Sequence, residues 1–159
     1  MSIENVRNYF RPLGREEDIM EFEVSSATVE LAAQAIGCEG ARITKTLAFK
    51  KDEGCILIAM AGDAKIDNKK FIAEFGMKAK MLTPEETLAL TGHAIGGVCQ
   101  FGVPEGTPCY CDISLQRFDY VYPACGSSNS AIKLNCEELF TYSNSLKWID
   151  VCKDWNGEE

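Results

Sequence analysis

The sequence predicts an α+β fold in which helices flank a mixed, curved β-sheet, and three observations lead to this fold class. The 159 residues, 46% hydrophobic and 25% charged, have the size and composition of one compact globular domain spanning residues 1–159. Helical patterns are interleaved with more strand patterns than a simple alternating order contains. Residues 55–62 (CILIAMAG) are apolar throughout, as expected for a strand covered on both faces.

The N-terminal part of the chain contains the patterns of two helices and three strands. In chain order we expect a helix at 3–14, a strand at 19–24, a helix at 28–37 and strands at 42–50 and 55–62. The helix at 28–37 is the clearest of these, because Thr28 can cap its N-terminus and Gly37 can end it.

The C-terminal part contains three further helices and four strands. We expect helices at 67–76, 83–92 and 136–143, and strands at 110–116, 120–126, 130–135 and 147–152. Thr83 and Glu86 have the spacing of a capping box, with Pro84 at the first helical position. Asn135 can cap the last helix.

A lysine stands in the middle of the strand at 42–50. Successive side chains of a strand point to opposite faces, so Lys45 shares a face with Ile43, Leu47 and Phe49. An ammonium group loses free energy on leaving water unless an anion meets it. Lys45 therefore either extends to the edge of the sheet, with its aliphatic stem packed, or receives a charged ligand.

The distribution of charge restricts the possible partners. The net charge of −8 argues against a long nucleic-acid duplex, and we expect neither DNA nor a membrane as a partner. Residues 42–80, however, hold nine Lys or Arg against five Asp or Glu. A mixed, solvated surface explains this segment, and so does a docking site for a small anionic end that includes Lys69 and Lys70.

Eight cysteines would suggest disulfides in a small secreted chain. Here they fall within apolar segments, and the sequence has neither an apolar run of signal-peptide type nor a segment long enough to cross a bilayer. We therefore expect a cytoplasmic protein with reduced, buried thiols. A zinc site at thiols such as Cys109 and Cys111 is the less favoured alternative, since no Cys-x-x-Cys spacing occurs and His93 is the only histidine.

Two segments, 91–102 (TGHAIGGVCQFG) and 124–134 (ACGSSNSAIKL), contain more special residues than a scaffold needs. Gly96 and Gly97 can turn backbone N–H groups toward an anion, or can simply form a tight turn. His93 can act as an acid or base, or can stabilise a helix C-terminus. The second segment offers groups that can hold a ribose or an amino group, or that only shape a turn: Ser127, Ser128, Asn129 and Ser130.

Taken in order, six segments resemble the YbaK/prolyl-tRNA-synthetase-associated domain family: 27–37, 42–50, 57–71, 90–102, 111–130 and 137–140. The resemblance runs over most of the chain, roughly from Val6 to Trp148. It implies a barrel-like mixed sheet and an aminoacyl-tRNA deacylase that removes a wrong small amino acid from tRNA, notably tRNA for proline, without a cofactor. The implied partners are the aminoacylated acceptor end of tRNA and prolyl-tRNA synthetase.

The resemblance also implies site residues. The family's near-signature lysine falls on Lys45 and is thought to engage the phosphate or terminal adenosine of the tRNA end. Asp112 matches an aspartate that shapes a strand. The family's two loops fall on Gly92, Gly96, Gly97 and Gly102, and on Gly126 and Ser127.

Two residues depart from the family pattern. Gln100 and Ala94 stand where many relatives have proline, and both changes are expected to loosen the loop backbone, because proline fixes φ. The choice of substrate could differ as a result.

An aminoacyl ester is already activated, so hydrolysis requires a placed water and a stabilised oxyanion rather than a covalent nucleophile. In this hypothesis Lys45 anchors the terminal nucleotide, the ribose hydroxyl helps to activate water, and the N–H groups around Gly96, Gly97 and Gly126 polarise the carbonyl. His93 and Ser127 are further catalytic candidates. Cys99 and Cys125 are interpreted as packing residues.

The alternative hypothesis is a binding module that holds a nucleotide or an aminoacyl-tRNA end without hydrolysing it. The acidic surface and Gln100 favour this alternative, since a shared fold does not guarantee activity.

Overall fold

The computed structural model describes residues 2–23, 28–127 and 129–155 and confirms the α+β fold class. The strands are β1 (Ile19–Glu21), β2 (Ile43–Lys51), β3 (Gly54–Ala61), β4 (Lys65–Ile66), β5 (Cys109–Asp112), β6 (Tyr122–Pro123), β7 (Ser130–Ile132), β8 (Trp148–Ile149) and β9 (Cys152–Lys153). The helices are α1 (Ser2–Phe10), α2 (Val29–Ile36), α3 (Asn68–Phe75), α4 (Pro84–Thr91) and α5 (Cys136–Tyr142).

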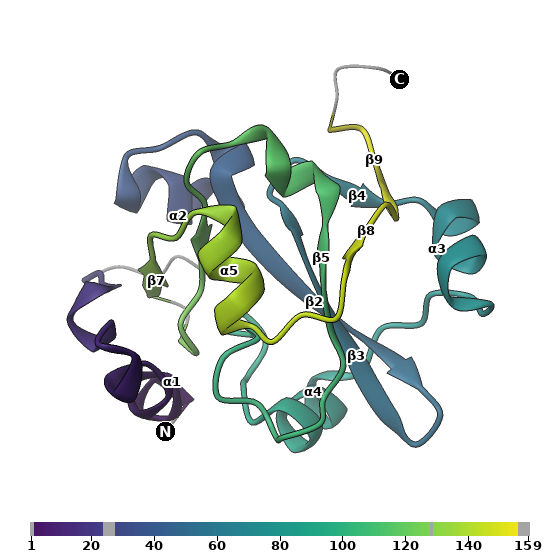
Figure 1. Cartoon of the computed structure of the whole chain (residues 1–159), viewed down its shortest axis with the longest axis horizontal. Helices are drawn as coiled ribbons and strands as arrows, with labels where there is room; N and C mark the ends of the chain where they lie inside the picture. Colours follow the sequence, from purple (N-terminus) through teal and green to yellow (C-terminus); the bar gives the residue numbers. More distant parts are fainter. Residues whose placement is uncertain (1, 24–27, 128, 156–159) are drawn as a thin grey trace.

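A five-stranded mixed sheet of order β6-β2-β3-β5-β8 forms the centre of the molecule (Figure 1). β2 and β3 are antiparallel, with Thr44 opposite Ala61 at one end and Lys51 opposite Gly54 at the other. The three outer strands are parallel to their neighbours in this sheet. Two small antiparallel sheets, β1-β7 and β4-β9, are formed by segments that flank the five-stranded sheet.

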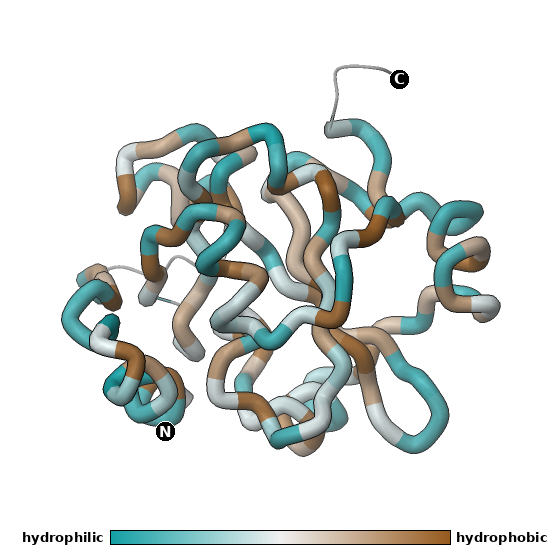
Figure 2. The backbone as a smooth tube through the Cα atoms, in the orientation of Figure 1, coloured by the Kyte–Doolittle hydropathy of each residue, from teal (hydrophilic) through white to brown (hydrophobic). Residues whose placement is uncertain are grey.

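Apolar residues cover both faces of β3, as its sequence predicts. Ile56 and Ile58 pack in the larger core with Phe71 of α3, whereas Leu57 packs in a smaller core with Ala48 of β2. Figure 2 shows the tip of the β2–β3 hairpin as hydrophilic, whereas β3 itself is apolar. The central β2–β3 hairpin is therefore the buried support against which the loops pack.

The helix ends follow the capping signals. The Thr28 side chain accepts the N–H of Leu31 at the start of α2. The predicted capping box of Thr83 and Glu86 begins α4, and Asn135 forms a capping box with Glu138 at α5. Each of these caps satisfies N–H groups that the first turn of a helix leaves without an intrahelical partner.

Several predicted strands are shorter in the structure. Residues 113–116, predicted to continue a strand, instead lie in a 3₁₀ turn (Ile113–Arg117), because the buried Asp112 carboxylate accepts the N–H groups of Ser114 and Val151, both at 2.9 Å. The strand at 147–152 is split into β8 and β9. Asp112 thus has the shaping role that the resemblance implied.

All eight cysteines are free thiols, and six of them are buried. Burial raises the pKa of Cys109 to about 12 and that of Cys111 to about 11, so both remain protonated near neutral pH. Within the described ranges, no three His, Cys, Asp or Glu side chains gather as a metal site would require. No helix in these ranges combines the length and apolar character needed to cross a bilayer.

Candidate functional site

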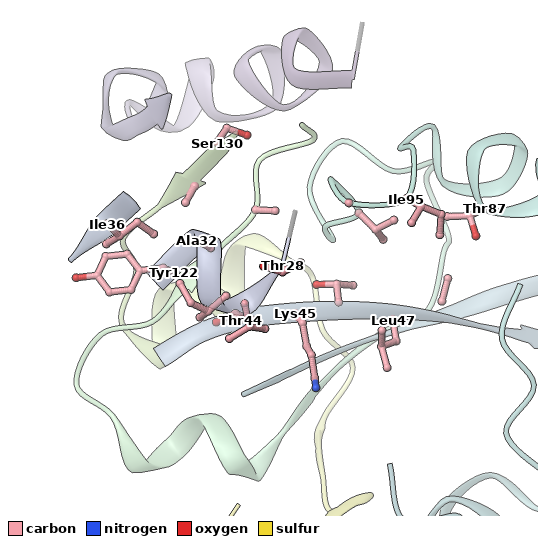
Figure 3. A pocket seen from close by; sticks show the side chains of 18 of the residues that line it. Thr28, Ala32, Ile36, Thr44, Lys45, Leu47, Thr87, Ile95, Tyr122 and Ser130 are labelled. Carbon is pink, nitrogen blue, oxygen red and sulfur yellow. The ribbon is translucent and has the colours of Figure 1, made fainter. Parts of the chain in front are cut away.

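A cavity of about 310 Å³ lies over the N-terminal half of β2. Its walls come from α2, from the loop that follows α4, and from β6 and β7 (Figure 3). The lining consists of Thr28, Val29, Ala32, Ile36, Ile43, Thr44, Lys45, Thr46, Leu47, Ala48, Met81, Thr87, Ile95, Gly96, Val98, Tyr122, Ala124, Ser130 and Ala131.

The cavity is apolar, with hydroxyl groups as its polar elements. Among the described lining residues, none carries an imidazole, a carboxylate or a thiol. The Thr87 hydroxyl donates to the Thr83 carbonyl oxygen at 2.8 Å. The Thr44 hydroxyl oxygen is buried without a hydrogen-bond partner in the described part of the chain. Such a site suits a small, uncharged group with hydrogen-bonding capacity, since an unpartnered buried hydroxyl is energetically costly.

Lys45 lines the cavity, but its ammonium group is directed elsewhere. In Figure 3 its side chain leaves β2 on the same side as Leu47, away from Thr87 and Ile95. Nζ lies 3.5 Å from the carbonyl oxygen of Gly62. Burial lowers the pKa of Lys45, and the nearby carboxylate of Asp63 only partly offsets this effect. The structure therefore holds a half-buried cation that forms no salt bridge with any carboxylate of the described residues.

The two glycine segments meet beside the cavity. A Cβ added to Gly97 would lie 2.7 Å from the backbone nitrogen of Ser127 and 2.8 Å from the carbonyl carbon of Gly126. Only glycine permits this approach of two backbones. Gly96, at φ +98°, lines the cavity, whereas the N–H of Gly97 donates to the Ala94 carbonyl oxygen at 3.0 Å. Gly97 thus contributes close packing, and its N–H is already engaged within the turn.

The polar residues after Gly126 are used mainly to hold the loop. The Ser127 hydroxyl lies 2.9 Å from Oδ1 of Asn129 and 2.7 Å from the Ser130 hydroxyl. The Asn129 side chain donates to the Phe22 carbonyl oxygen at 2.8 Å, which connects this loop to the end of β1. Ser130, which the sequence groups with Ser127, Ser128 and Asn129 as a residue that can hold a ligand or shape a turn, lines the cavity. Ser128 lies outside the described residues.

His93 and Gly102 lie outside the cavity lining. His93 is buried, with Nε2 2.8 Å from the carbonyl oxygen of Phe101, and burial lowers its pKa. Gly102, at φ +71°, packs against α1, where an added Cβ would lie 3.2 Å from the Asn5 carbonyl oxygen. Both residues hold the glycine loop against the core.

Lys69 and Lys70 are also remote from the cavity, because α3 lies on the opposite side of the molecule from α2 and β7 (Figure 1). Nζ of Lys70 is 3.0 Å from Oδ1 of Asp150 and 3.1 Å from the Cys152 carbonyl oxygen. The basic residues of segment 42–80 therefore do not converge on the cavity.

Gln100 corrects one expectation from the sequence. Instead of leaving the glycine loop looser, its buried side chain donates to the carbonyl oxygens of Leu57 at 3.2 Å and Tyr110 at 2.9 Å. These bonds join the loop to β3 and β5, so the amide restrains the loop where relatives have proline.

The interpretation of Cys99 and Cys125 as packing residues agrees with their complete burial. Burial raises the pKa of Cys99 to about 12, and backbone hydrogen bonds at Phe101 and Gly126 offset only part of this rise. A thiol with such a pKa is a poor nucleophile at neutral pH.

Comparison with known proteins gives consistent similarities. Residues 23–142 match the model of the aminoacyl-tRNA editing domain family. An uncharacterized protein of Bacillus subtilis (strain 168), YwhH, is 56% identical over 98% of this chain and 99% of its own length. The proline–tRNA ligase of Shouchella clausii is 29% identical over 65% of this chain, a segment that corresponds to 18% of the ligase.

Solved structures share the fold. A proposed trans-editing enzyme for prolyl-tRNA synthetase superposes with a TM-score of 0.86 at 29% identity, over 96% of this chain and 97% of the other. The hypothetical protein APE2540 superposes with a TM-score of 0.81 at 22% identity, over 94% of this chain and 99% of the other.

Proposed function

Because this chain belongs to the aminoacyl-tRNA editing domain family, we propose that it is a deacylase that hydrolyses mischarged aminoacyl-tRNA in trans. The similarity covers nearly the full length of both YwhH and the proposed trans-editing enzyme, so this chain resembles proteins of its own size. Its similarity to part of proline–tRNA ligases supports tRNA for proline as the substrate and prolyl-tRNA synthetase as a partner. We place this activity in the cytoplasm.

The cavity over β2 is the single observation that carries this proposal. Its volume of about 310 Å³ and its apolar, hydroxyl-bearing lining suit an aminoacyl group with a small, uncharged side chain. Larger side chains would be rejected by their size. Charged side chains would be rejected because Lys45, the one charged residue of the described lining, directs its ammonium away from Thr87 and Ile95.

The lining also suggests how the ester is cleaved. The described lining residues include no imidazole, carboxylate or thiol, and the Lys45 ammonium is directed away from Thr87 and Ile95, so we assign the activation of water to the ribose hydroxyl of the substrate itself. The backbone around Gly96 and Gly126 is assigned to stabilise the oxyanion, with Gly97 keeping these two segments in contact. Positioning of the water next to the ester carbonyl then provides most of the rate acceleration of hydrolysis.

Lys45 is proposed to bind the terminal phosphate of the tRNA. Its half-buried ammonium, with a lowered pKa and no carboxylate partner, would be stabilised by an arriving anion. This contact requires Nζ to leave the position drawn in Figure 3, where it has only the long interaction with Gly62.

A panel of tRNAs for proline charged with alanine, serine, cysteine or proline tests the proposal. We expect hydrolysis of at least one mischarged species and its loss, by about a hundredfold or more, in Lys45→Ala with an unchanged melting temperature. Lys50→Ala is the matched control, because Lys50 is on the same strand but exposed and paired with Glu86 at 3.4 Å. Near wild-type activity of Lys45→Ala would remove Lys45 from the mechanism. Binding without turnover across the panel would instead support the non-catalytic binding module.

A further inference from the structure

A second hollow, which we call the tyrosine groove, adjoins the cavity at Tyr122. It has a volume of about 560 Å³ and is lined by Gly37, Cys38, Glu39, Arg42, Asp119, Tyr120, Tyr122 and Lys133. Tyr122 belongs to the linings of both hollows. In Figure 3 its ring lies beside Ile36 at one end of the cavity, and its hydroxyl points away from Thr44 and Lys45.

The groove differs from the cavity in its chemistry. It contains two aromatic rings and two cations, Arg42 and Lys133, together with the carboxylates of Glu39 and Asp119. Nζ of Lys133 lies 4.3 Å from the centroid of the Tyr120 ring, and 41% of Tyr120 is exposed. Arg42 is 2.6 Å from Asp119. The groove is thus aromatic and close to neutral overall, with the Lys133 ammonium next to an accessible ring.

The aromatic rings stand on a fixed piece of backbone. Val121, between the two tyrosines, exchanges hydrogen bonds of 2.8 and 3.0 Å with Leu134, the neighbour of Lys133. Alternation along an extended segment places Tyr120 and Tyr122 on the same side of it. The side chains that line the groove are therefore positioned by strand pairing rather than by a free loop.

The proposed substrate has two chemically different parts. The amino acid has a small, uncharged side chain in our assignment, whereas the single-stranded 3′ end of the RNA carries bases and phosphates. Proteins hold such single strands by stacking bases on aromatic rings, with cations beside the backbone. Among the described residues that line the cavity, Tyr122 is the only aromatic one, so we expect the RNA end to leave the cavity toward an adjoining surface.

We propose that the tyrosine groove binds the terminal nucleotides of this single-stranded RNA end, with a base stacked on Tyr120 and a phosphate beside Lys133. The inference rests on the proposed function, since it takes the acyl group to occupy the cavity. Stacking on an aromatic ring tolerates any base, because every base has a π-face. A protein with a net charge of −8 can bind an RNA end in this way.

The test compares Tyr120→Ala with Tyr120→Phe, which keeps the ring. We expect Tyr120→Ala to raise KM by about tenfold while kcat at saturation stays within about twofold, and Tyr120→Phe to resemble the wild type. A parallel titration uses an acceptor-stem oligonucleotide whose 3′ end carries a non-hydrolysable alanyl amide. Its Kd should rise by about the same factor in Tyr120→Ala, and melting temperatures should agree among the three proteins.

The outcomes separate the groove from the proposed activity. Binding of the oligonucleotide that depends on Tyr120, without hydrolysis of any charged tRNA, would support the groove and contradict the deacylase. Hydrolysis with an unchanged KM in Tyr120→Ala would overturn the groove. In that case Ile95→Ala should raise KM, because Ile95, 58% exposed, marks another rim of the cavity.

Discussion

His93 is enclosed by the loop after α4, and its environment makes a pH-dependent prediction at the scale of single residues. Burial lowers the pKa of His93 below its ordinary value of 6.5. The unfolded chain therefore binds a proton at a higher pH than the folded chain does. The stability contributed by neutral His93 is present above about pH 6.5 and decreases as the pH falls from there toward the folded pKa.

Thermal melting between about pH 7.5 and pH 5 measures this effect. We expect the melting temperature to fall with acid, and to fall less in His93→Gln, which starts from a lower stability because its hydrogen bond to Phe101 is altered. We also expect the pH profile of kcat to be the same in the wild type and in His93→Gln. An inflection of kcat near pH 6.5 that is present in the wild type and absent in His93→Gln would show that His93 takes part in the chemistry.

Single residues of the cavity were predictable only in part. Strand alternation correctly places Thr44 and Thr46 on the opposite face of β2 from Lys45. From the sequence, however, Lys45 was selected for its charge, and the face that carries the two threonine hydroxyls was not selected. Which face of β2 borders a cavity depends on where α2 and the glycine loop pack, and these are contacts between distant parts of the chain. Ser130 was likewise identifiable as a polar loop residue but not as a wall of the cavity.

The contact between the two glycine segments makes a prediction at the scale of elements. In Gly97→Ala, a methyl group would have to occupy a point 2.7 Å from the nitrogen of Ser127, so one segment must move away from the other. We expect a loss of about 1–3 kcal/mol in the free energy of unfolding and a strong loss of substrate binding. Denaturant melts and binding titrations measure the two effects.

Gly54→Ala is the matched control for this prediction. Its added Cβ would meet nothing closer than the Lys51 carbonyl oxygen, at 4.0 Å, and its φ lies outside the left-handed region. A Gly97→Ala protein as stable and as active as Gly54→Ala would show that the two segments need not touch.

Elements with local signals were predicted well, and elements without them were not. Caps at Thr28, Thr83 and Asn135 are set by residues within a few positions, so the helix starts follow from the sequence. The short strands β6, β8 and β9 exist because distant partners offer hydrogen bonds. The 3₁₀ turn after Asp112 likewise depends on a carboxylate that also binds Val151, far along the chain.

At the scale of the whole molecule, the fold class and the family resemblance were correct, whereas the basic segment 42–80 did not become a basic surface around the site. Its cations are dispersed over the structure and several are paired, as Arg42 is with Asp119 and Lys70 with Asp150. These charges are close together in the sequence, but the fold does not bring them together on one surface. Long-range attraction of RNA is therefore weak, and the net charge of −8 opposes it further.

This arrangement predicts a shallow dependence of RNA binding on salt. If only the acceptor end docks, about two or three phosphates are neutralised, and the slope of log K against log salt is roughly −0.7 per contact with a single strand. Lys133→Ala should reduce the slope by about one contact. Lys69→Ala and Lys70→Ala should leave it unchanged, because α3 is remote from both the cavity and the groove.

Titrations of full-length tRNA and of a short acceptor-stem mimic at several salt concentrations measure these slopes. End docking requires similar affinities and similar slopes for the two RNAs, since the rest of the tRNA makes no contact with the acidic surface. Much tighter binding of full-length tRNA with a steep slope, weakened by Lys69→Ala or Lys70→Ala, would place the RNA across α3 and contradict end docking. With end docking we expect a low intrinsic affinity, so delivery of mischarged tRNA by the proposed partner, prolyl-tRNA synthetase, is expected to speed editing.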